Sequence, residues 1–137
     1  MVKNQKKVLV TGASGYLALH CISELLEKGF FVRGSLRDLK KEREVRRALG
    51  NKIKGDNFEV CELNLLDDYG WDIFTSNCDY LLHIASPCIV KEPKDEKDII
   101  DPAVKGTLRA LKAAHKSSVK KVILTSSIGS IVFGHNK

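Results

Sequence analysis

VLVTGASGYLALH, residues 8–20, carries a short β-branched run into a turn that contains Gly12 and Gly15. Such an unbroken apolar run is typical of a strand that is buried on both faces of a parallel sheet. From Leu17 onward, apolar residues recur at three- and four-residue spacing, which predicts a helix that ends before Gly29. This stretch therefore predicts a strand, a glycine turn and a helix in immediate succession.

The glycine turn has the chemistry of an anion-binding site. Glycine adopts positive φ in a tight turn and lets the backbone come close to a phosphate. The free N–H groups and the positive end of the following helix attract the anion. Ala18 occupies the third position of the pattern, where the helix packs against the strand and alanine is accepted. We therefore predict that Gly12 and Gly15 contact a dinucleotide pyrophosphate, rather than merely joining a strand to a helix.

Strand-like and helix-like segments alternate along the rest of the chain. Helical patterns cover residues 40–49, a short stretch within 68–76, and 97–117. The runs typical of buried strands are residues 7–11, 30–36, 58–63, 80–85 and 121–126. This alternation predicts an α/β fold, a doubly wound parallel sheet of the Rossmann type with five strands. We see no internal boundary and expect one dinucleotide-binding domain over residues 1–137.

Composition excludes several other classes of protein. The formal net charge is +6, but the basic cluster at residues 37–47 is interleaved with acids and lacks an aromatic platform, so we expect no nucleic-acid partner. The apolar runs are too short to cross a bilayer, and the first residues lack a secretory signal, so we expect a cytoplasmic protein without a membrane partner. No metal or redox pair is indicated, because the candidate ligands are scattered. These are Cys21, Cys61, Cys78, Cys88, His20, His83, His115 and His135.

The end of the second predicted strand indicates which nicotinamide cofactor would bind. A dinucleotide fold usually carries an acid at this point, for the adenosine ribose, but here Arg37 comes first. A guanidinium suits a 2′-phosphate because it donates a forked pair of hydrogen bonds. Asp38 follows one residue later and would point to the other side of a continuing strand, while Lys41 adds positive charge. The pattern favours NADP(H) over NAD(H), the alternative being that Arg37 is a surface cation.

Five segments together resemble a known family. They are VTGASGYLA (10–18), VRGSLRD (32–38), WDIFTSNCDYLLHIASP (71–87), DPAVKGTLRALKAA (101–114) and VKKVILTSS (119–127). In this order and spacing they resemble the extended short-chain dehydrogenase/reductase superfamily, within the wider NAD-dependent epimerase/dehydratase group. The enzymes that they resemble most are those similar to dihydroflavonol reductase and cinnamoyl-CoA reductase. The resemblance covers essentially the whole chain, as the N-terminal part of such an enzyme.

The resemblance implies a role for each matching position. The family usually has Asp-Leu against the adenine, and this chain has Asn64-Leu65, so that an amide replaces a carboxylate. The implied cofactor contacts are Gly12, Gly15, Tyr16 and Leu17 along the pyrophosphate, Arg37 and Lys41 at the 2′-phosphate, Asn64 and Leu65 at the adenine, and Ile84, Ala85 and Ser86 beside the nicotinamide ribose. For Trp71, Cys78 and His83, which also match the family, we expect a place in the packed core.

The resemblance also implies a catalytic serine without its usual proton donor. Ser127 would hydrogen-bond the carbonyl oxygen of the substrate as negative charge develops there. The family takes the proton from a tyrosine that stands four residues before a lysine. Four residues after Tyr16, Tyr69 and Tyr80 stand His20, Ile73 and Ile84, so this pair does not occur in the 137 residues. We therefore expect the C-terminal part of the fold and the substrate domain to be missing here.

These observations lead to one expected function and two alternatives. We expect the NADP(H)-binding portion of an oxidoreductase that transfers hydride between NADPH and a carbonyl or alcohol, with no turnover from the 137 residues alone. The first alternative is a non-catalytic NADP(H)-binding module, and the second is half of a nucleotide-sugar epimerase or dehydratase, which Arg37 disfavours. We further expect apolar side chains of 80–85 and 121–126 to lack a covering helix, and the chain to self-associate through that face.

Overall fold

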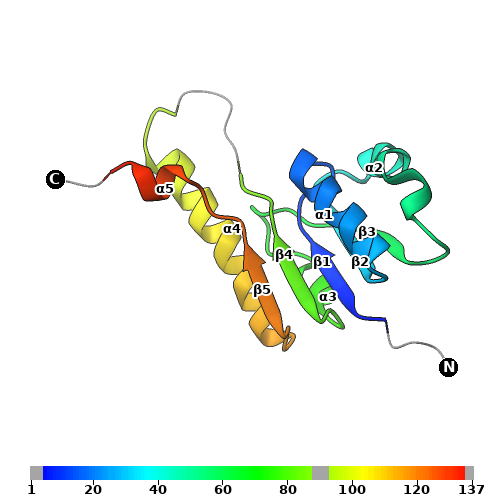
Figure 1. Cartoon of the computed structure of the whole chain (residues 1–137). Helices are drawn as coiled ribbons and strands as arrows, with labels where there is room; N and C mark the ends of the chain where they lie inside the picture. The colour runs from blue at the N-terminus through cyan, green and yellow to red at the C-terminus, as the bar shows by residue number, and fades with distance from the viewer. Residues whose placement is uncertain (1–4, 88–92, 135–137) are drawn as a thin grey trace.

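The computed structural model describes residues 5–87 and 93–134, and its centre is a parallel sheet (Figure 1). The strands are β1 (Lys7–Val10), β2 (Phe31–Leu36), β3 (Phe58–Glu62), β4 (Tyr80–His83) and β5 (Lys121–Leu124). All pairings are parallel, and the spatial order is β3-β2-β1-β4-β5. This order changes direction between β1 and β4, as in doubly wound nucleotide-binding sheets. The predicted fold class is thus confirmed.

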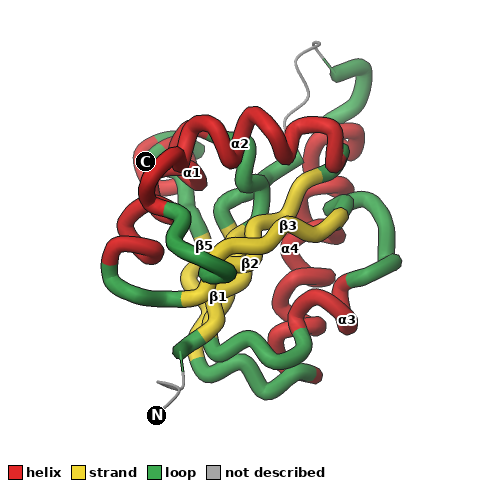
Figure 2. The backbone as a smooth tube through the Cα atoms, turned by 90° about the vertical axis from the view of Figure 1, so that its right-hand side faces the viewer, coloured by secondary structure: helices red, strands yellow, loops and turns green. Residues whose placement is uncertain are grey.

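Helices cover both faces of the sheet. They are α1 (Tyr16–Glu27), α2 (Glu42–Leu49), α3 (Trp71–Thr75), α4 (Lys97–Lys116) and the short α5 (Gly129–Val132), with 3₁₀ turns η1 (Leu39–Lys41) and η2 (Gly50–Lys52) beside α2. Figure 2 shows the sheet nearly edge-on, with α1 and α2 on one side and α3 and α4 on the other. The helix predicted at 40–49 is observed as the end of η1 followed by α2. The short helix α5 was not predicted.

Residues Val8–Val10 of β1 are all apolar because β1 is covered on both faces. Val8 and Val10 belong to the apolar cluster beneath α1 and α2, whereas Leu9 belongs to the cluster beneath α3 and α4. Successive side chains of a strand point to opposite faces, so a strand covered on both faces has to be apolar at every position. All three side chains are fully buried. The glycine turn therefore emerges from the centre of the core.

Strand β5 is poorly covered by the described residues, and its exposed apolar side chains lie on both faces of the sheet. Ile123 and Leu124 are 55% and 47% exposed, while Val122 packs against the cluster under α4. The neighbouring side chains of β4 are better covered, because Leu81 is fully buried and Leu82 is half-buried. The expected lack of cover is therefore confirmed for β5, whereas β4 is largely packed.

Candidate functional site

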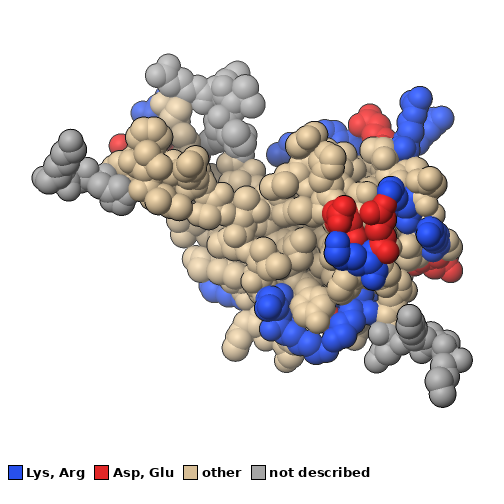
Figure 3. Space-filling model, viewed as in Figure 1, with Lys and Arg blue, Asp and Glu red and all other residues tan. Residues whose placement is uncertain are grey.

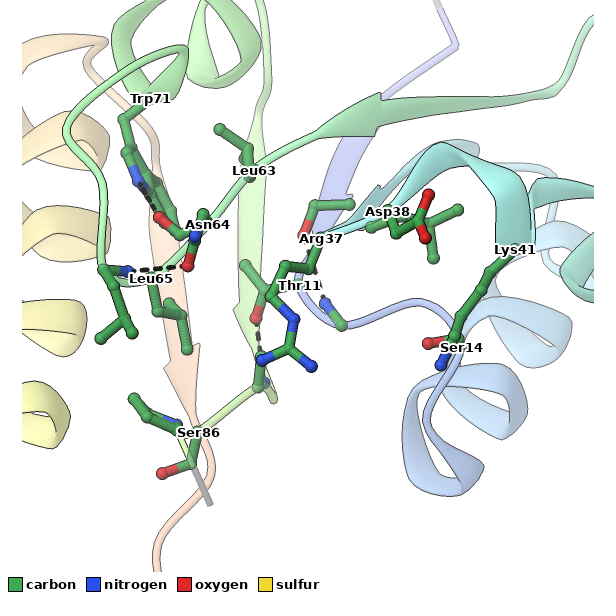
Figure 4. A pocket seen from close by; sticks show the side chains of 16 residues that line it. Thr11, Ser14, Arg37, Asp38, Lys41, Leu63, Asn64, Leu65, Trp71 and Ser86 are labelled. Atoms are coloured by element: carbon green, nitrogen blue, oxygen red, sulfur yellow. Dashed lines mark hydrogen bonds between the residues drawn. The ribbon is translucent and has the colours of Figure 1, made fainter. Parts of the chain in front are cut away.

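A cavity of about 490 Å³ lies at the carboxyl ends of the strands, where the strand order changes direction (Figure 4). This size and this place are those of small-molecule sites in open α/β sheets. Its lining residues are Thr11, Gly12, Ser14, Ser35, Leu36, Arg37, Asp38, Lys41, Leu63, Asn64, Leu65, Leu66, Trp71, Ala85, Ser86 and Pro87. The cavity therefore joins the glycine turn to the segments that follow β2, β3 and β4.

The glycine turn fits tightly against neighbouring backbone. Gly12 has φ +73°, and a Cβ atom there would lie 2.9 Å from the Cβ of Ala85, so both conformation and space require glycine. The Gly12 N–H donates to Ser35 Oγ at 3.2 Å, and the Ala13 N–H donates to the Ser35 carbonyl at 2.8 Å. The end of β2 therefore holds the first half of the turn in place.

The first turn of α1 is open to an anion. Gly15 is its N-cap and, having no side chain, leaves the first N–H groups of the helix without a side-chain partner. No acidic residue lies in that turn. Unpaired N–H groups and the positive end of a helix dipole together attract a phosphate. The start of α1, directly after the cavity-lining Ser14, therefore has the chemistry that binds a pyrophosphate.

Thr11 links the end of β1 to the segment that leaves β4. Its buried Oγ1 accepts hydrogen bonds from the N–H groups of Ile84 and Ala85, each at 3.0 Å, and lies 3.0 Å from Nδ1 of His83. A hydroxyl has two acceptor lone pairs and one hydrogen. Because the two N–H groups occupy the lone pairs, the hydroxyl hydrogen is donated to His83 Nδ1.

This donation fixes the state of His83. Nδ1 must be unprotonated to accept, so the ring is neutral and carries its hydrogen on Nε2. Burial lowers the pKa of His83 below its ordinary value of 6.5, which favours the same neutral form. His83 lies in the core as expected, and through Thr11 it supports the backbone that enters the cavity at Ala85.

Two cations without partners stand at the mouth of the cavity. Among the described residues, nothing forms a hydrogen bond or an ion pair with the side chains of Arg37 and Lys41. Figure 4 shows the Arg37 side chain extending into the cavity. Exposed cations that converge on a cavity, with no carboxylate paired to them, suit an anionic group such as a phosphate.

Asp38 does not lie where a continuing strand would place it. Strand β2 ends at Leu36, so the alternation of sides stops there, and Asp38 lines the same cavity as Arg37. Its Oδ1 accepts from the Lys40 N–H at 2.9 Å and caps η1. The expectation that Asp38 points to the other side applied to a continuing strand, and this condition is not met, because the chain turns into η1 instead of extending.

The loop after β3 forms the opposite wall. Asn64 Oδ1 accepts from the Leu66 N–H at 3.0 Å, and the Asn64 carbonyl accepts from Trp71 Nε1 at 3.2 Å. Trp71 is 3% exposed and also donates to the Asp67 carbonyl, so it braces this loop from the core, as expected of its packing role. Leu65 and Leu66 add apolar surface beside Asn64.

The structure gathers most of the predicted residues into one cavity, but not all of them. Those that line it are Gly12, Arg37, Lys41, Asn64, Leu65, Ala85 and Ser86. Those that do not are Gly15, Tyr16, Leu17, Ile84 and Ser127. Tyr16 is 81% exposed at the start of α1, and Ser127 Oγ accepts from the Gly129 N–H at 3.2 Å beside the short α5. The roles of all these residues stay predictions.

Sequence reasoning missed Thr11 and Ser35 as supports of the cavity. Each is a small hydroxyl residue at the end of a strand, and each satisfies backbone N–H groups of a neighbouring segment. The available signal was their position: buried polar residues need partners, and both stand where a buried strand meets the glycine turn. No sequence pattern specifies which N–H groups they satisfy.

Neither metal ligands nor a membrane span emerge from the described residues. Within residues 5–87 and 93–134, no group of three or more candidate metal-ligating side chains comes together. No helix of this part of the chain is long and apolar enough to cross a bilayer. Cys21, Cys61 and Cys78 are free, and burial raises the pKa of Cys61 to about 12. Cys88 and His135 lie outside the described residues.

Residues 8–137 match the sequence profile of the NAD dependent epimerase/dehydratase family. The chain is 37% identical over 129 residues to cinnamoyl-CoA reductase CAD2 of Medicago truncatula, covering 92% of this chain and 39% of that one. It is 35% identical over 127 residues to anthocyanidin reductase of Arabidopsis thaliana, covering 92% and 37%. The chain thus spans less than two fifths of the length of these relatives.

Solved structures give the same picture. Yeast methylglyoxal/isovaleraldehyde reductase Gre2 complexed with NADPH superposes with a TM-score of 0.76 at 30% identity, covering 90% of this chain and 37% of that one. Gre2 of Candida albicans in complex with NADPH gives a TM-score of 0.77 at 27% identity, covering 90% and 38%.

Replacement of Thr11 by valine should loosen the segment that leaves β4. The variant leaves two buried N–H groups and the His83 ring without their partner, so we expect the free energy of unfolding to fall by about 2–4 kcal/mol. Chemical denaturation measures the loss. T11S, which keeps the hydroxyl, should lose much less, and T107V on α4 is the matched control. Equal stability of T11V and T107V would contradict the role assigned to Thr11.

Acidification should weaken the fold through His83. Its pKa is lowered in the folded state, so this histidine contributes stability that is complete above its unfolded value of about 6.5 and is lost as the pH falls below it. We expect the difference in unfolding free energy between wild type and H83N, whose amide oxygen accepts but does not titrate, to shrink from pH 7 to pH 5. Urea titrations at each pH measure it, and a difference that stays constant would contradict the neutral His83.

Proposed function

Because this chain belongs to the NAD dependent epimerase/dehydratase family, we propose that it is the NADP(H)-binding portion of an oxidoreductase. The reaction would transfer hydride between NADPH and a small-molecule carbonyl or alcohol. One observation carries the proposal: a single cavity is lined both by the glycine turn, at Gly12 and Ser14, and by the cations Arg37 and Lys41, and α1 begins directly after this turn. The relatives are named as reductases, and two structural neighbours are NADPH complexes, which supports the same assignment.

The cavity offers a separate group for each anionic part of the cofactor. The backbone at Gly12 and the first turn of α1, with Tyr16 and Leu17, hold the pyrophosphate. The guanidinium of Arg37 donates a forked pair of hydrogen bonds to the 2′-phosphate, and Lys41 adds its charge. This pairing selects NADP(H) over NAD(H), because the ribose hydroxyl of NAD(H) gives the cations no charge to neutralise.

The other cofactor residues lie on the two remaining walls. Asn64 and Leu65 hold the base after β3, and the segment Ile84–Ser86 passes beside the nicotinamide ribose after β4. The Thr11 hydroxyl fixes the backbone of this segment, so the group that carries the hydride is held against a rigid wall. When bound, NADPH supplies the hydride.

Ser127 would polarise the carbonyl group of the substrate. Its Oγ accepts from the Gly129 N–H, which uses a lone pair and leaves the hydroxyl hydrogen available for donation. A hydrogen bond to the carbonyl oxygen stabilises the negative charge that this oxygen gains as hydride arrives at carbon. We also propose a cytoplasmic location, where buried thiols such as Cys61 and Cys78 stay reduced.

The cofactor preference is tested at Arg37. We expect NADPH to bind the wild-type chain more tightly than NADH, and R37A to weaken NADPH binding about tenfold or more while leaving NADH nearly unchanged. Titration calorimetry on the 137-residue chain measures both. R47A, an exposed cation on α2 outside the cavity, is the matched control. If NADH binds as tightly as NADPH, or if R37A and R47A behave alike, the assignment of NADP(H) fails.

The exposed apolar face suggests a second copy of this chain as its partner. Strand β5 is an edge strand of the described sheet, and α5 follows it in the chain after residues 125–128. The exposed apolar side chains there are Ile123, Leu124, Ile128, Val132 and Phe133. Figure 3 shows few charged atoms over β5 and α5. Edge strands with exposed apolar side chains pair readily, so we propose that the 137-residue chain self-associates here.

A charge placed on this face should abolish the association. We expect the sedimentation coefficient of the wild-type chain to rise with concentration and that of I123K to remain at the monomer value. I73K is the matched control, because Ile73 is 60% exposed on α3, on the other face of the sheet. Sedimentation velocity measures all three. A wild-type chain that stays monomeric, or an I73K variant that dissociates as I123K does, would contradict the interface.

A further inference from the structure

Within the described residues, the Asn64 side chain forms a hydrogen bond through its oxygen but not through its nitrogen. Its Oδ1 accepts from the Leu66 N–H at 3.0 Å, which closes the turn after β3. Because a backbone N–H can only donate, the oxygen of the amide has to face Leu66, and the nitrogen has to face elsewhere. Figure 4 shows the Asn64 oxygen in its hydrogen bond to that turn. Among the described residues nothing accepts a hydrogen bond from it.

The position of Asn64 relates this free amide to the base of the cofactor. The glycine turn and α1 hold the phosphates at the end of β1, and Arg37 holds the ribose phosphate at the end of β2. The next part of the ligand in the same direction, toward β3, is the base. There it meets the Asn64 amide and the apolar side chains of Leu65 and Leu66.

We propose that Asn64 determines which purine the site prefers, by directing the hydrogen-bond donor of its amide at the edge of the base. A carboxylate at this position would keep one oxygen for Leu66 and offer the other to the 6-amino group of adenine. The amide instead offers N–H, which suits a carbonyl oxygen at the same place, as in hypoxanthine. This inference rests on the proposed binding of NADP(H).

The test compares NADPH with its reduced hypoxanthine analogue by titration calorimetry on the 137-residue chain. We expect the analogue to bind wild type at least as tightly as NADPH. In N64D the ratio of the analogue Kd to the NADPH Kd should rise about tenfold, because a carboxylate accepts from the amino group and repels the carbonyl. The added charge weakens both ligands through their phosphates, and the ratio cancels this common effect.

Two further variants make the comparison specific. N51D adds the same charge at an exposed asparagine in η2, outside the cavity, and should leave the ratio unchanged. N64S keeps an acceptor for the Leu66 N–H without the amide donor, and should shift the ratio toward adenine less than N64D does. Thermal melts establish that each variant keeps the wild-type fold before its ratio is compared.

Each outcome has a distinct meaning. A ratio that rises in N64D and stays constant in N51D supports the assignment. If both dinucleotides bind but the ratio stays within about twofold in N64D, Asn64 does not choose the base, and NADP(H) binding itself stands. If wild type favours NADPH as strongly as N64D does, the donor assignment is overturned. If neither dinucleotide binds wild type, the proposed function falls, and this inference falls with it.

Discussion

The cavity depends on the hydrogen bonds of one buried hydroxyl. Thr11 Oγ1 accepts hydrogen bonds from the N–H groups of Ile84 and Ala85 and donates its hydrogen to His83. These bonds hold the end of β1 against the segment that leaves β4. The same contact brings Ala85 so close that only glycine fits at position 12. A sheet whose order changes direction necessarily opens a crevice between these strands. The Thr11 hydroxyl determines how wide that crevice is at its base.

The walls of the cavity after β2 and β3 are also held by hydrogen bonds to backbone groups. Ser35 binds the Gly12 N–H, Asp38 caps η1 and Trp71 supports the turn at Asn64. Each of these groups satisfies backbone N–H or carbonyl groups that leave a strand and would otherwise lack a partner. The loops at the carboxyl ends of the strands are therefore ordered by the chain itself, which lowers the conformational entropy that a ligand has to remove on binding.

Much of this was predictable from the sequence, and the remainder has a physical reason. The run 7–11, which is apolar from Val8 to Val10, and the glycines that follow it predict the sheet and the turn, because both follow from local pattern and steric rules. The side of the chain on which Asp38 lies was not predictable, since it depends on whether β2 continues or turns into η1. Strand β4 ends at His83, two residues before the end of the predicted run 80–85, because the N–H groups of Ile84 and Ala85 donate to Thr11. The spacing of apolar residues does not reveal such a tertiary contact.

The bonds made within the chain also decide what is left for a ligand. Thr11 and one oxygen each of Asp38 and Asn64 are consumed by backbone N–H groups, which removes acceptors from the cavity. Among the described residues that line the cavity, those that keep free hydrogens include Asn64, at its amide nitrogen, and the cations Arg37 and Lys41, and the open first turn of α1 begins beside the cavity. A cavity so rich in donors stabilises a ligand rich in acceptors, and phosphates are the strongest such groups available. The proposed preference for a phosphorylated dinucleotide would thus arise as much from the acceptors that folding has used up as from the two cations at the mouth.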